Sequence, residues 1–207
     1  MSKRTMLAVL LLGAIGAHSA SAAGGPGGPG ATTPLSAAET ADLRFMREEE
    51  KLARDVYLQL YEQWAMPQFS NIASSEQSHM DAMLRLLRRY QLADPAAGMT
   101  TGEFNDASLQ ALHDNLMALG SVSGLAALKV GGFIEEADMQ DIVAAIDRSK
   151  HADIDQTYGR LLCGSRNHLR AYATQVSLVT GSAYVAQVLE QSEVDAIIFT
   201  ATERCGP

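Results

Sequence analysis

The stretch Ser70–Tyr90, SNIASSEQSHMDAMLRLLRRY, decides the fold class of this chain. Its apolar residues recur at alternating steps of three and four, which is the spacing of one face of an amphipathic helix. Two ionisable residues, Glu76 and His79, stand on that same face, one turn apart. Because an unpaired carboxylate is costly in a core, the sequence predicts that Glu76 has a compensating partner there.

Four long helices are predicted around this pattern, at residues 36–64, 70–94, 133–149 and 154–179. The first begins at a capping box formed by Ser36 and Glu39 and ends ahead of Pro67. The connection to the second helix is short, so these two helices should be antiparallel neighbours. Weaker segments are predicted as a helical crossover and a C-terminal tail, at residues 104–119, 123–129 and 184–207. The sequence therefore predicts an all-α, antiparallel four-helix bundle.

The N-terminal region is typical of an export signal. Lys3 and Arg4 precede an apolar run, and Ala20-Ser21-Ala22 matches a signal-peptidase site. We therefore expect an exported protein, periplasmic or secreted, without stable membrane insertion once the signal is cleaved. An uncleaved membrane anchor is the alternative.

Three segments follow from these boundaries: a signal peptide at 1–22, a Gly/Pro-rich flexible linker at 23–34 and a helical domain at 35–207. The mature chain would keep 14 basic and 24 acidic residues, a formal charge of −10. No basic patch interleaved with aromatic residues remains, so nucleic acid is not an expected partner. Cys163 and Cys205 could form a disulfide in an oxidising compartment or remain as two thiols, and the sequence leaves both open.

Each of the four predicted helices carries at least one metal-competent side chain on an otherwise apolar stripe. The candidate metal ligands are Glu50, Glu76, His79, Glu135, Asp138 and His168. Glu49 and Glu136 are neighbouring carboxylates that could replace Glu50 or Glu135. Carboxylate together with imidazole favours iron, with manganese or zinc as alternatives, and disfavours calcium, which prefers oxygen ligands alone. No organic cofactor is indicated.

Four stretches of the chain resemble the ferritin-like superfamily, which includes the rubrerythrins, and within it an uncharacterised domain family of unknown function. They are EEEKLARDVY (48–57), FSNIASSEQSHMDAM (69–83), GGFIEEADMQDI (131–142) and GSRNHLRAY (164–172). The resemblance implies a carboxylate-bridged di-metal site in the core of a four-helix bundle. In it, Glu50 matches a ligand on the first helix of rubrerythrins, and Glu76 with His79 matches the Glu-x-x-His of the second helix.

The later helices depart from that pattern. Di-metal members of the superfamily have a glutamate on one of these helices and a complete Glu-x-x-His on the other. Here the third helix offers Glu135-x-x-Asp138 and the fourth offers Ser165-x-x-His168. Ser165 and Asn167 are poor ligands, so we expect them to support the ligands instead.

Three functions follow as expectations, and the sequence leaves open whether the protein is an enzyme. The first is an exported metal-binding protein with an oxidase or ferroxidase centre. The second is a metal-binding module without turnover, and the third is a structural or partner-binding bundle that has lost the site. A metal-free network of Glu50 and Glu76 with His79, His168 or Arg54 is the competing interpretation of the buried charges. Copper bound by methionines is a minor alternative, and a homo-oligomer is compatible with the sequence.

Overall fold

The structure, a computed structural model, describes residues 34–206. The predicted signal peptide and the linker up to residue 33 lie outside the described residues. Within 34–206 all regular structure is helical, which confirms the all-α prediction. The helices are α1 Ala37–Trp64, α2 Pro67–Arg89, α3 Ala107–Gly120, α4 Gly124–Arg148, α5 Ala152–Thr180 and α6 Gln191–Ile198. None of them combines the length and the apolar character that a membrane span requires.

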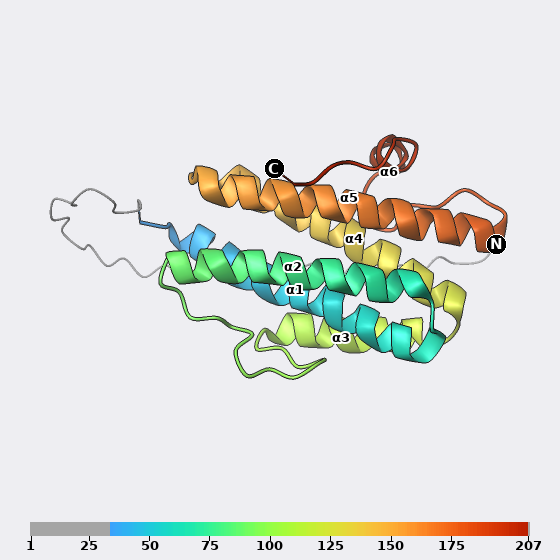
Figure 1. Ribbon diagram of the computed structural model, residues 1–207, viewed down its shortest axis with the longest axis horizontal. Coiled ribbons are helices and arrows are strands. Elements are labelled where there is room, and N and C mark those ends of the chain that lie inside the picture. Colours follow the sequence, from blue (N-terminus) through green and yellow to red (C-terminus); the bar gives the residue numbers. More distant parts are fainter. Residues whose placement is uncertain (1–33, 207) are drawn as a thin grey trace, which may run out of the picture. The chain divides into compact units, whose positions relative to one another are not determined.

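The long helices pack side by side into a helical bundle (Figure 1). The predicted capping box opens α1: Ser36 Oγ accepts from the Glu39 backbone N–H at 3.1 Å, and Glu39 Oε2 accepts from the Ser36 N–H at 2.8 Å. Two residues, Ala65 and Met66, separate α1 from α2, so these helices run antiparallel. The connection between α4 and α5 is also short, so these two helices run antiparallel as well. Helix α3 packs on α1 and α4.

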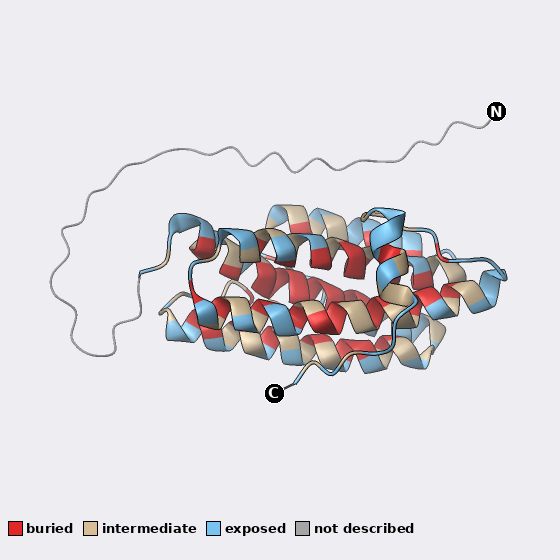
Figure 2. Cartoon of the chain, turned by 90° about the horizontal axis from the view of Figure 1, so that it is seen from above, coloured by how far each residue is buried: buried red, intermediate tan, exposed pale blue. Residues whose placement is uncertain are grey.

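The buried residues, coloured red in Figure 2, lie along the inward faces of these helices. They form two apolar clusters at different levels of the bundle. On α1, for example, Leu43 and Met46 belong to one cluster, whereas Leu52 and Val56 belong to the other. On α1, α2 and α5 the polar residues of the predicted stripes occur in the sequence between these two sets. On α4 they lie at the end of one set, between Ile134 and Met139. The core is therefore interrupted by a polar layer, which is where a site would have to be.

The crossover differs from the prediction, because α4 is one continuous helix through Gly131 and Gly132. Two glycines inside a helix weaken it, but here each allows a close contact. A Cβ on Gly131 would lie 2.4 Å from the ring of Tyr172, and one on Gly132 would lie 2.2 Å from the hydroxyl of Tyr184. Tertiary packing of these two tyrosines explains the glycines, which the sequence alone marked as a break.

Several element ends also differ from the prediction. Helix α2 ends at Arg89, five residues before the predicted end, and α3 begins at Ala107, where Asp106 caps it. Gly120 is the last residue of α3 and lies against Leu60. The tail contains an unpredicted helix, α6, packed on α5.

A disulfide between Cys163 on α5 and Cys205 ties the tail to the bundle, with their Cα atoms 5.5 Å apart. This decides between the two states that the sequence left open. Glu203 reinforces the attachment, because its carboxylate pairs with Arg166 and Arg170. Asn167, expected to support the metal ligands, instead donates from Nδ2 to the Glu203 carbonyl at 3.0 Å.

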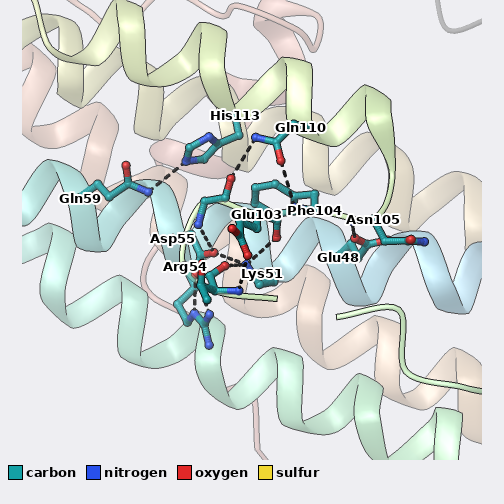
Figure 3. A network of polar contacts seen from close by, with 12 residues as sticks. Glu48, Lys51, Arg54, Asp55, Gln59, Glu103, Phe104, Asn105, Gln110 and His113 are labelled. Carbon is teal, nitrogen blue, oxygen red and sulfur yellow. Dashed lines mark hydrogen bonds and ion pairs between the residues drawn. The ribbon is translucent and has the colours of Figure 1, made fainter. Parts of the chain in front are cut away.

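Lys51 and Asp55 lie outside the apolar stripe of α1, a position that predicts a solvated face, and that prediction is wrong. Both are fully buried, because the segment between α2 and α3 covers this face (Figure 3). Lys51 Nζ donates to the carbonyls of Thr100 at 2.7 Å and Glu103 at 2.9 Å and pairs with Asp55. These contacts attach the covering segment to α1, and each of the three N–H groups of Lys51 has an acceptor.

Candidate metal centre

Five of the six predicted ligands meet in the polar layer. Glu50 comes from α1, Glu76 and His79 from α2, Glu135 from α4 and His168 from α5. They form two sets of three that share Glu76. In each set, one ligand atom from every residue lies within 4.8 Å of the others. The regular spacing of each helix therefore aims these side chains at a common point from four directions.

Glu76 uses its two oxygens on opposite sides. Its Oε2 lies 2.8 Å from His79 Nδ1, which also lies 3.1 Å from Glu50 Oε2. Its Oε1 lies 2.8 Å from His168 Nδ1, which lies 3.3 Å from Glu135 Oε2. One carboxylate between two imidazoles, each with a further carboxylate, is the donor arrangement of a bridged pair of metal ions.

Two carboxylate oxygens of the layer are buried and make no hydrogen bond or ion pair within residues 34–206. They are Glu50 Oε1 and Asp138 Oδ1. A buried polar atom without a partner costs about 1–3 kcal/mol, so two in one layer of a native core call for a missing partner. Carboxylate oxygens and an imidazole nitrogen are also the ligand types of iron, manganese and zinc. The residues present therefore fit a bound transition-metal ion.

Asp138, the sixth predicted ligand, lies beside this group and is held by Ser165. Ser165 Oγ donates to Asp138 Oδ2 at 2.5 Å, and the Leu161 carbonyl of its own helix, 3.0 Å away, is the alternative acceptor for the same proton. Asp138 Oδ1 has no such partner. The prediction that Ser165 supports a ligand therefore agrees with its contacts.

Other residues orient the ligands. Tyr57 donates its hydroxyl to Glu135 Oε1 at 2.6 Å, and Ser75 Oγ lies 2.9 Å from His168 Nε2. Gly164 makes room for His79, because a Cβ there would lie 2.6 Å from the imidazole Cε1 and Nε2. Neither Ser75 nor Gly164 is among the residues predicted from the sequence to line the site as ligands. A glycine inside a helical pattern was the available signal for the second.

The charges of the layer are strongly coupled. Burial acts against an ionised Glu76, but His168 and His79 outweigh it and hold the pKa of Glu76 below its usual value. Burial and the neighbouring Glu135 charge raise the pKa of Asp138 to about 8. Burial also raises the pKa of Glu50 and of Glu135. Burial acts to lower the pKa of His168, but the charges of Glu76 and Glu135 outweigh it and raise that pKa to about 10.

Glu49 and Glu136, the two carboxylates that could replace Glu50 or Glu135, occupy different positions. Glu136, expected to face solvent or support a ligand, is fully buried and accepts from the Tyr184 hydroxyl and the backbone N–H groups of residues 187–189. It anchors the segment before α6, so it does not replace Glu135. Glu49 is buried near Asp141, and burial followed by the charge of Asp138 raises the pKa of Glu49.

Of the three partners in the competing metal-free network, His79 and His168 do pair with the buried carboxylates, whereas Arg54 does not. Arg54 pairs with Asp55 and donates to Gln77 Oε1 at 2.6 Å, away from Glu50 and Glu76. Three of the methionines considered for copper, Met46, Met83 and Met139, pack in the apolar clusters.

Two further histidines are also buried. His113 Nε2 lies 3.0 Å from Gln59 Nε2, and His151 Nδ1 lies 2.7 Å from Glu39 Oε1. Neither belongs to the polar layer.

Comparison with known proteins places this geometry in a family without an assigned activity. Residues 39–201 match the model of a family described as an uncharacterised protein domain, DUF2202. The uncharacterised protein MJ0754 of Methanocaldococcus jannaschii is 43% identical over 171 residues, which is 83% of this chain and 92% of that protein. A crystal structure of hypothetical protein MJ0754 has a TM-score of 0.81 at 42% identity and covers 84% of this chain and 98% of that one.

Proposed function

The chain belongs to the DUF2202 family, whose description assigns no activity, and we propose that it is a metal-binding protein with a ferritin-like core. The two linked sets of ligands would hold up to two ions, with Glu76 between them. Glu50 and His79 would bind on one side, and Glu135 and His168 on the other. Iron is the expected metal, with manganese or zinc as alternatives.

The observation that carries the proposal is Glu76. Its carboxylate is buried and lies 2.8 Å from both histidines. Such a layer is expensive unless its charges are balanced, and a multivalent cation balances several carboxylates at once. The antiparallel helices around it support the proposed ferritin-like four-helix bundle.

We further propose that an iron-loaded centre supports oxidation with dioxygen or peroxide. A bound metal would supply the redox chemistry, while the chain would orient it: Tyr57 holds Glu135, and Ser75 holds His168. Export is proposed from the predicted signal peptide, and the disulfide between Cys163 and Cys205 is consistent with an oxidising compartment.

Metal analysis of the purified mature protein tests the proposal directly. We expect one to two transition-metal ions per chain, with loss of metal in Glu76→Ala and His79→Ala and no change in Glu62→Ala, whose residue is exposed on α1. Trace metal in every preparation, unaffected by the two ligand substitutions, would remove the proposal.

The second candidate is a metal-binding module without turnover, which would use the same ligands as an oxidase. Oxygen consumption on addition of ferrous iron separates the two. Binding of iron without consumption of oxidant would favour the module. A structural bundle without a site would show no metal-dependent rise in melting temperature.

A further inference from the structure

A cavity of about 500 Å³ lies between α2 and α5, beside the polar layer. One wall consists of residues spaced along one face of α2, and the other of residues along one face of α5. Its lining includes Arg85, Arg89, Asp153, Arg160 and His79. We call this cavity the arginine groove. Its volume is in the range of pockets that take small organic ligands.

The groove meets the candidate metal centre at His79. Of the five clustered ligands, the other four are buried, whereas the His79 side chain is 12% exposed and lines the groove. A small molecule that enters the groove therefore meets the imidazole edge of the centre first. Cys205 lines the same space, so the disulfide-bound tail forms part of its wall.

The charge of the groove contrasts with that of the protein. The whole chain has a formal charge of −8, yet three arginines gather here against one carboxylate. That carboxylate, Asp153, already pairs with Arg89 at 3.1 Å and accepts the Tyr90 hydroxyl at 2.8 Å. Arg85 and Arg160 form no ion pair within residues 34–206, so two guanidinium groups remain to bind a ligand.

We propose that the arginine groove binds a small oxyanion, the carboxylate or phosphate group of a substrate, and presents that molecule to the metal centre at His79. A guanidinium group binds either oxyanion through two parallel hydrogen bonds, which suits both recognition and orientation. The placement next to a metal depends on the proposed function, whereas anion binding in the groove does not.

Isothermal titration calorimetry of the metal-free protein, with inorganic phosphate and with succinate, tests the first part. The double variant R85Q/R160Q should bind the preferred anion at least about tenfold more weakly than the wild type, the cost of losing charge-assisted hydrogen bonds. The control R44Q/R88Q removes the same charge from two exposed arginines outside the groove, and should change the affinity less than about twofold.

Tighter binding of phosphate or of succinate would identify the oxyanion source, and either result supports the proposal. Failure of the wild type to bind both anions, or equal weakening in the two double variants, would overturn it.

Spectroscopy of the cobalt-loaded protein tests the second part. Adding the anion should shift the visible absorption bands of Co²⁺ in the wild type and leave them unchanged in R85Q/R160Q. If the anion binds but the Co²⁺ bands do not shift, the proposal that the groove presents the anion to the metal centre is overturned. If cobalt does not bind while the anion still does, the proposed function fails and the groove stands.

Discussion

Ser165 on α5 donates a 2.5 Å hydrogen bond to Asp138 on α4. The resemblance to di-metal proteins leads one to expect a glutamate at the serine position. Here a carboxylate from the neighbouring helix lies beside that position, and the serine orients it. Asp138 on α4 therefore supplies a carboxylate beside Ser165, the position on α5 where the glutamate is missing.

Replacing Ser165 should accordingly weaken metal binding without unfolding the protein. In Ser165→Ala the Asp138 carboxylate loses its only hydrogen-bond donor among the described residues, and we expect about 10-fold weaker metal affinity, typical of an orienting contact. A competition titration with a chelator measures this. Ser192→Ala, at an exposed position on α6, serves as the control, and equal affinities for both variants would contradict the assignment.

Gly164 offers a test that depends on shape alone. Gly164→Ala places a methyl group 2.6 Å from the His79 ring, so the imidazole has to move and metal binding should be lost. We expect a destabilisation of about 1–3 kcal/mol from overpacking. Gly159→Ala on the same helix meets nothing within 4 Å and should be neutral or stabilise the protein by up to about 1 kcal/mol. Denaturant unfolding and metal analysis of both variants provide the comparison, and retention of metal in Gly164→Ala would contradict the geometry.

Glu39 should make stability depend on pH in the acid range. Burial opposes its ionised form, but hydrogen bonds from the Ser36 backbone, His151 and Lys150 prevail and lower the pKa of Glu39 to about 2 from 4.5. Because the folded pKa is depressed, the stabilisation is complete above about pH 4.5 and is lost as the pH falls towards 2. After allowance for solvent screening at this helix end, we expect it to be about 1 kcal/mol.

The measurement is the free energy of unfolding of Glu39→Gln and wild type between pH 7 and pH 2. The difference between the two proteins should be largest at neutral pH and shrink below pH 4.5. A difference that is constant over this range would exclude an electrostatic role for Glu39.

The disulfide should stabilise the fold by restricting the unfolded chain. Cys163 and Cys205 are 42 residues apart, and closing a loop of that size contributes about 2–4 kcal/mol. Thermal unfolding with and without a reductant measures the effect. The wild type should lose stability on reduction, whereas C163S/C205S should be less stable from the start and insensitive to the reductant. A wild type that does not respond to complete reduction would contradict this prediction.

Helical periodicity was enough to find most of the candidate site. Glu50, Glu76, Glu135 and His168 each interrupt an apolar stripe, and the burial of a helical face is a local property that a three-to-four residue spacing reveals. The same spacing predicted the long helices and their antiparallel order where the connections are short. The sequence could not choose between Glu135 and Glu136, because both are buried and only their contacts distinguish them.

By itself, therefore, the sequence determined the all-helical class, the four buried stripes and the ionisable residues that interrupt them, because each depends on neighbours within two turns of one helix. Only the tertiary structure decided the rest: Lys51 and Asp55 lie under a covering segment, α4 continues through Gly131, and Asp138 turns to Ser165. Each of these outcomes depends on a partner far away in the chain. A pattern of single residues carries no record of which partner that is, since distant contacts form only when the helices pack.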